Sequence, residues 1–82
     1  MNTVSLALVK HAREMMRHYA LMWAAVHKTL LTTPGLDDGQ KTALRALRRK
    51  HLACAASYRE DAAFHAAEAH RTAQWAGIET PV

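Results

Sequence analysis

Hydrophobic residues recur at intervals of three and four over two long stretches, which lie on either side of a short segment near the middle of the chain. In the first stretch, about residues 3–31, these positions share one side of a helix with 3.6 residues per turn. Lys10, Arg13, Glu14, Arg17 and Lys28 fall on the opposite side, which is typical of an amphipathic helix. The apolar stripe consists of Leu8, Ala12, Met15, Tyr19, Met22, Val26 and Leu30, and it is widened on one side by Val9, Met16 and Trp23.

The second stretch, about residues 39–76, predicts a longer helix. Its apolar face comprises Leu44, Leu47, His51, Cys54, Ala55, Tyr58, Ala62, His65, Ala69 and Ala73. We expect Gly77 and Ile78 to end this helix in a Schellman motif, and residues 77–82 to form a frayed tail. Ser57 and Glu60 have the spacing of a capping box, so a break near Ser57, which would give three helices, is the alternative to one continuous helix.

The segment 32–38 predicts a reversal of the chain. Pro34 disfavours helical geometry at Thr33, and Gly35 permits backbone angles that other residues resist. Asp37 then has the character of an N-cap, with Gln40 at the third helical position, as in a capping box. The sequence therefore predicts a single all-α domain over residues 1–82, an antiparallel hairpin of two long helices.

Composition adds an expectation of association and of location. Many of the hydrophobic residues among the 82 are alanine, so a lone hairpin would have a thin core, and we expect it to join a helical bundle, as a homodimer or with a partner. The longest apolar run, residues 20–26, is too short to span a membrane. The N-terminus lacks a basic signal-peptide region, and the chain has one cysteine. A cytoplasmic protein without a membrane segment is expected.

Two groups of residues have the chemistry of a reactive or metal-binding site. His51 and Cys54 could pair as base and nucleophile, but a thiol in mid-helix has no neighbour that would activate it. We therefore predict that the chain is not an enzyme and has no cofactor. Imidazoles and carboxylates that the hairpin could bring together suggest a metal site as a less favoured hypothesis. The alternative is that these acids pair with histidines or arginines at the edge of the core. The candidate ligands are His11, Glu14, His18, Asp61, His65 and Glu68.

Basic residues crowd the start of the second helix. The formal net charge of the chain is +4, which favours acidic partners. A nucleic-acid-binding face is one interpretation, because arginine and lysine contact phosphates; a solvated face that keeps the helix soluble is the other. The residues concerned are Lys41, Arg45, Arg48, Arg49, Lys50 and Arg59.

Large apolar residues away from the expected core give the leading hypothesis. Phe64 and Trp75 lie about three turns apart on one side of the second helix, and Leu21 lies off the core side of the first. Such residues commonly mark a contact surface, although a three-helix form of the fold could bury them internally. We therefore predict a small non-enzymatic interaction protein that docks onto a larger protein or ribonucleoprotein and modulates or inhibits it. Phe64, Trp75 and Leu21 would be its apolar anchors, and Arg45, Arg48 and Arg49 its polar contacts.

Overall fold

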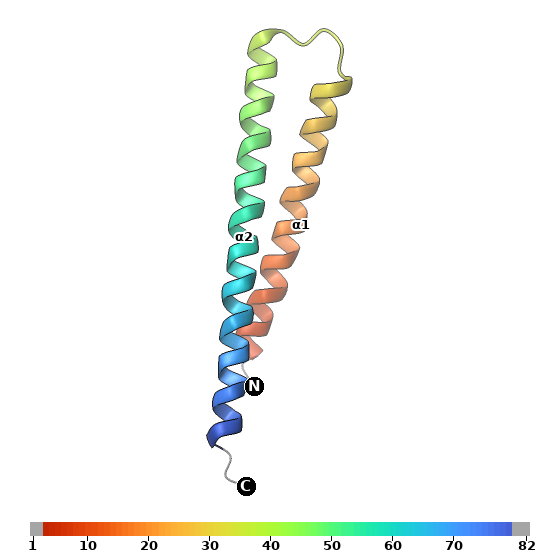
Figure 1. The fold of residues 1–82 in the computed structure, drawn as a ribbon. Coiled ribbons are helices and arrows are strands. Elements are labelled where there is room, and N and C mark those ends of the chain that lie inside the picture. The colour runs from red at the N-terminus through yellow and green to blue at the C-terminus, as the bar shows by residue number, and fades with distance from the viewer. Residues whose placement is uncertain (1–2, 80–82) are drawn as a thin grey trace.

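The computed structural model describes residues 3–79, with side chains described as far as residue 73. It consists of two helices, α1 (Thr3–Thr32) and α2 (Asp38–Glu79), which lie side by side and run in opposite directions (Figure 1). The prediction of an all-α helical hairpin is confirmed. Helix α2 passes through Ser57 without interruption, so the three-helix alternative is wrong. Ser57 and Glu60 have the spacing of a capping box, but the residues on both sides of them are helical, so no new helix begins at Ser57.

The connection between the helices has the predicted chemistry. Gly35 adopts a φ of 76°, a conformation that L-residues with a side chain rarely adopt. The backbone N–H of Gln40 donates to Oδ1 of Asp37 over 2.7 Å, and the N–H of Asp37 donates to Oε1 of Gln40 over 3.0 Å. These reciprocal bonds form a capping box and satisfy amide groups that the first turn of α2 leaves without helical partners. Asp38, in that same turn, is favourably placed against the helix dipole.

Helix α2 is the longer of the two and extends beyond the N-terminal end of α1 (Figure 1). It has 42 residues against 30, a difference of about 18 Å at 1.5 Å per residue. The helix continues through Gly77 to Glu79, so the predicted Schellman stop at Gly77 is wrong. A glycine permits the left-handed residue of that motif but does not require it.

The helices meet along a seam that includes most of the predicted positions but leaves three of the predicted large residues exposed. Leu8 and Met22 of α1 and Leu47 of α2, all expected in the core, are 39%, 36% and 40% exposed. Most of the residues that are buried or half-buried on α1 are spaced alternately by four and three, as in a coiled coil, and Met15 and His27 beside them are also half-buried. In α1 the seam consists of Ser5, Val9, Ala12, Met16, Tyr19, Trp23, Val26 and Leu30; in α2 it consists of Lys41, Leu44, Arg48, His51, Ala55, Tyr58, Ala62, His65, Ala69 and Thr72.

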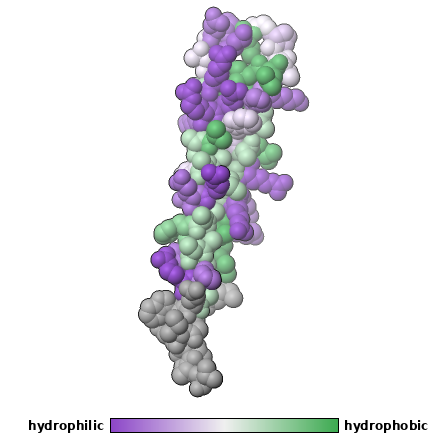
Figure 2. Space-filling view, viewed as in Figure 1, coloured by the Kyte–Doolittle hydropathy of each residue, from purple (hydrophilic) through white to green (hydrophobic). Residues whose placement is uncertain are grey.

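The resulting molecule is a thin rod with extents of 71 × 14 × 14 Å. Within the described residues, the buried hydrophobic side chains are Val9, Ala12 and Ala62, and no large side chain is fully enclosed. Figure 2 shows hydrophobic side chains at the surface, interleaved with hydrophilic ones along the rod. Because each of the two helices packs against only one neighbour, most of their side chains are exposed, and much of the apolar surface remains in contact with water. Neither helix, over the part that the structure describes, has an apolar stretch sufficient to cross a membrane.

Candidate interaction surface

Two of the apolar anchors predicted from the sequence, Leu21 and Phe64, lie on different helices and do not share one patch. Leu21 is 63% exposed on α1 and Phe64 is 60% exposed on α2. Tyr19 lies level with Tyr58 and His51, so Phe64 lies roughly 20 Å along the rod from Leu21. The ring of Phe64 contacts its neighbour His65 edge-on at 5.3 Å. The side chain of Trp75 lies outside the described residues.

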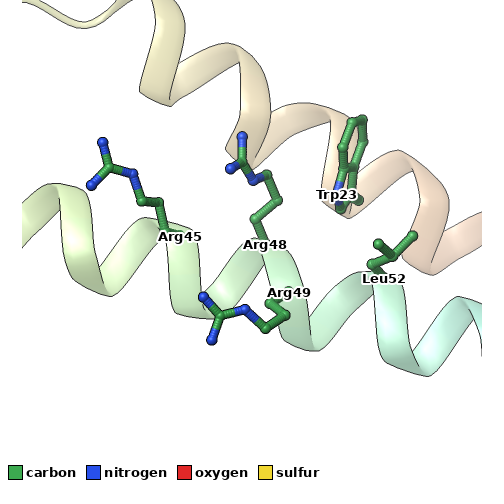
Figure 3. Close-up of a pocket in the computed structure, with 5 residues that line it drawn as sticks. All are labelled: Trp23, Arg45, Arg48, Arg49 and Leu52. Carbon is green, nitrogen blue, oxygen red and sulfur yellow. The ribbon is translucent and has the colours of Figure 1, made fainter.

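An open groove on one flank of the seam combines basic and apolar side chains from both helices. It has a volume of about 440 Å³ and is lined by Trp23, Arg45, Arg48, Arg49 and Leu52. Figure 3 shows that Trp23 comes from α1, whereas the other four residues come from successive turns of α2. We call these five residues the arginine groove. It unites three predicted contact residues with two that the sequence analysis did not assign to a surface.

Arg48 is held in place by α1, whereas its two neighbours are free. One Nη1–H of Arg48 donates to Nδ1 of His27 over 2.8 Å, since a guanidinium has no acceptor. The imidazole of His27 in turn stacks on the indole of Trp23, with ring centroids 4.8 Å apart and planes inclined by 11°. This chain of contacts fixes the half-buried Arg48 across the seam. Arg45 and Arg49 are exposed.

The electrostatics of the groove favour an anionic ligand. Arg45, Arg48 and Arg49 occupy little more than one turn of α2, and no carboxylate in the described part of the chain pairs with any of them. Three guanidinium groups at this spacing repel one another, and a carboxylate or phosphate that binds between them relieves this repulsion. Trp23 and Leu52 add an apolar wall, so the groove suits a ligand that is both acidic and partly apolar.

The remaining predicted basic residues are spread around α2. Arg59 lies on the same flank as the groove, where it lines a smaller hollow of about 210 Å³ with Met16, Leu52, Ala55 and Ala56. Lys41 is half-buried at the seam, and Lys50 is exposed but does not line the groove. Sequence reasoning did not assign Trp23 or Leu52 to this groove. Trp23 is part of the broad apolar stripe of the first helix, and Leu52 is not part of the apolar face predicted for the second. Leu52 follows Arg49 by three residues and Arg48 by four, and this spacing could have indicated that it lies beside them.

A second stripe borders the seam of α1 on the other flank. Each of its residues precedes a seam residue by one position, or 100° around the helix, whereas His27, which contacts Arg48, follows the seam residue Val26. The stripe carries no lysine, arginine, aspartate or glutamate, and we call it the neutral stripe. Its members are Val4, Leu8, His11, Met15, His18 and Met22.

Aromatic and imidazole rings take the place of aliphatic residues in the middle of the seam. The rings of Tyr19 and Tyr58 stack across it, with centroids 5.8 Å apart and planes inclined by 12°. The ring of Tyr19 also lies 6.0 Å from His51, and Tyr58 receives the ring of His11 edge-on at 6.4 Å. Stacked and edge-to-face pairs of this kind stabilise a contact beyond the area that they bury.

His51 differs from the other rings of this cluster in the hydrogen bonding of its imidazole. Its side chain is only 6% exposed, and within the described structure its buried Nδ1 has no hydrogen-bond partner. We expect His51→Leu to raise the free energy of unfolding by about 1 kcal/mol, because it removes a desolvated polar atom while keeping apolar volume. Urea denaturation measures the change, and His51→Gln, which keeps a polar group there, should give no gain. A loss of stability in the leucine variant would contradict this account of the imidazole.

The predicted metal ligands are not assembled into a site. Among the described residues, no three histidine, cysteine, aspartate or glutamate side chains are arranged to hold a metal ion. Glu68 forms an ion pair with Arg71 on the same helix, and His11 packs against Tyr58. His18 lies edge-on to Tyr19 at 5.3 Å, and His65 is half-buried in the seam. Glu14 and Asp61 are exposed.

The thiol of Cys54 is half-buried on α2, one turn from His51. His51 lies in the seam, where its ring centroid is 6.0 Å from that of Tyr19. The arrangement with the clearest capacity for recognition is therefore the arginine groove, with the neutral stripe on the opposite flank.

Comparison of the chain with models of protein families, with curated proteins and with solved structures finds no match.

Proposed function

We propose that this protein is a non-enzymatic helical interaction module that docks onto a larger protein or ribonucleoprotein complex and modulates or inhibits it. The observation that carries the proposal is the arginine groove, in which Arg45 and Arg49 lie beside Trp23 and Leu52 and pair with no carboxylate among the described residues. Tryptophan and arginine are the residues that most often dominate the energy of protein interfaces. A rod of this size acts on a large assembly by occupying one of its surfaces.

The character of the groove also indicates which kind of partner surface it fits. The guanidinium groups of Arg45 and Arg49 are free to make bidentate contacts with carboxylates, and Arg48 is already oriented by His27. The apolar wall formed by Trp23 and Leu52 would cover a hydrophobic side chain of the partner. An acidic protein segment with an apolar residue at its centre would fit both the arginines and the apolar wall of the groove. The single cysteine supports action in a reducing compartment such as the cytoplasm.

A nucleic-acid-binding regulator is the second candidate function. Two observations favour it: over the part of the chain with described side chains, Arg45, Arg48 and Arg49 have no carboxylate partner, and Arg59 extends the basic flank beyond the groove. Such a flank could follow a phosphate backbone, and binding would then weaken steeply as the salt concentration rises. No exposed aromatic side chain stands between these basic residues in the described part of α2 to stack on bases, which is why this candidate is second.

The test is the double variant Arg45→Gln/Arg49→Gln. Because both residues are exposed and unpaired, we expect unchanged helicity and at least a tenfold loss of affinity for partners captured by the parent from a lysate of its native host. The matched control is Lys28→Gln/Lys50→Gln, which removes the same charge from exposed positions outside the groove. Equal capture by all three proteins would refute the role of the groove.

The same proteins distinguish the two candidate functions. Capture that resists nuclease treatment supports a protein partner. Capture that nuclease abolishes, together with salt-sensitive binding of duplex DNA or RNA that the arginine variant loses, supports the nucleic-acid function. If the parent binds neither duplex at low salt, the nucleic-acid candidate is excluded.

A further inference from the structure

We infer that the partner segment is an acidic amphipathic helix, which lies lengthwise on the flank of the rod that carries the arginine groove and packs against both α1 and α2. This inference rests on the proposed function, since it names the partner at the same surface. It also adds a second contact region, which lies on α1 outside the arginine groove.

Three hollows follow one another along this flank. The first has a volume of about 340 Å³, is lined by α1 alone and begins at Leu6. The second is the smaller hollow beside Met16 and Arg59, and it shares Leu52 with the third, the arginine groove beside Trp23. From Leu6 to Trp23 the row is about 25 Å long, at 1.5 Å per residue. An elongated ligand fits such a row, and a helix is the element that ordinarily packs between two others.

The register of α1 places the first hollow on the same flank as the arginine groove. Lys10, Arg13 and Arg17, which line the first hollow, each follow a seam residue by one position, or 100° around the helix. His27, which contacts Arg48 in the arginine groove, also follows a seam residue of α1 by one position. The two regions therefore face the same side of the rod, opposite the neutral stripe.

The formally charged residues that follow the seam on this flank are all basic over the described residues. Neither helix has an aspartate or glutamate at these positions, and their exposed lysines and arginines form no ion pair in the part of the chain with described side chains. Glu14 is the one carboxylate among the residues that line the three hollows. Such a surface complements acidic side chains along its length. These basic residues, which we call the basic band, are Lys10, Arg13, Arg17, Arg45, Arg49 and Arg59.

The apolar side chains in the hollows favour a protein helix over a nucleic acid. Leu6 and Val9 line the first hollow, Met16 lines the second, and Trp23 and Leu52 line the arginine groove. A phosphate backbone offers these side chains no apolar contact, whereas the apolar face of an amphipathic helix covers them and its acidic edges meet the basic band. The flank also has small side chains that let a helix approach closely. They are Ala20, Ala24, Ala56 and Ala63.

The test uses the purified protein and a synthetic peptide of about 18 residues, which as a helix spans the row of hollows. Leucine repeats in this peptide at intervals of three and four, glutamate borders the leucines on both sides, and alanine fills the other positions. A shuffled peptide of the same composition lacks the helical period. We expect the amphipathic peptide to bind at least tenfold more tightly than the shuffled one in fluorescence anisotropy. Equal binding of the two peptides, or a dissociation constant of the amphipathic peptide above about 100 µM, overturns the inference.

Arg13→Gln/Arg17→Gln tests the part of the basic band outside the arginine groove. Both side chains are exposed, and no ion pair of the described residues involves them, so we expect unchanged helicity and about tenfold weaker binding of the amphipathic peptide. The control is Lys28→Gln/Lys50→Gln, which removes the same charge from exposed positions outside the band and should bind as the parent does. Equal affinity of these two variants for the peptide overturns the inference.

A nucleic acid is the competing occupant of this flank. The same measurement with a DNA and an RNA duplex at physiological salt compares it with the helix. Weaker binding of both duplexes than of the amphipathic peptide supports the helix. Tighter binding of either duplex, with the steep salt dependence of phosphate contacts, overturns the inference.

Capture from the host lysate separates this inference from the proposed function. Loss of partners by Arg45→Gln/Arg49→Gln but not by Arg13→Gln/Arg17→Gln would refute the long helical contact and leave the arginine groove in its role. Peptide binding that depends on both arginine pairs, with lysate capture that is equal for the parent and both variants, would support the helical contact and refute the function.

Discussion

Ala12→Asp is expected to abolish the cooperative thermal unfolding transition and most of the helical circular dichroism at 25 °C. Ala12 is 3% exposed, in the seam against α2. A short aspartate side chain there cannot reach water, and burial of an unpaired carboxylate costs several kcal/mol. Domains of this size have a total stability near the lower end of about 5–15 kcal/mol, so one such change is comparable to the whole.

Ala20→Asp is the matched control for this experiment. Ala20 is exposed in the interior of the same helix, so its substitution has the same loss of helix propensity, about 0.7 kcal/mol or less, without burial of the charge. The difference between the two variants therefore measures burial at the seam. Equal stability of the two would show that Ala12 faces solvent and that the helices do not meet in this register.

Tyr58→Ala has the second largest expected effect, a loss of about 2–4 kcal/mol in the free energy of unfolding. The ring of Tyr58 stacks on Tyr19 and receives His11 edge-on, so it fills the space between the helices in the middle of the seam. The alanine variant leaves a gap between the two helices. Urea denaturation, with the slope compared among variants, measures the change.

Two further variants separate the ring from its hydroxyl. Tyr58→Phe keeps the stacking and should cost less than about 1 kcal/mol. A double-mutant cycle with Tyr19→Ala should give a coupling energy of about 0.5–1.5 kcal/mol, which is typical of aromatic pairs. A phenylalanine variant as unstable as the alanine variant would contradict the account in terms of ring packing.

The sequence by itself determined the local structure around the turn. The capping box of Asp37 and Gln40 and the reversal at Gly35 depend on residues within four positions of one another, and both are present as predicted. Helix α1 ends one residue from the predicted end. At Gly77 the sequence was ambiguous, because a glycine can end a helix or continue it, and here it continues.

Only the tertiary structure decided which side chains of each helix face the other. The sequence of α1 contains two adjacent apolar stripes, one with Leu8 and Met22 and one with Val9 and Trp23, and periodicity alone cannot rank them. The position of α2 selects the second and exposes the first. It also brings Trp23 and His27 of α1 against Arg48 of α2, which completes the arginine groove. Local patterns in the sequence determine the helices and the turn. A surface with residues from both helices also depends on how the two helices are aligned, and the pattern of one helix does not determine that alignment.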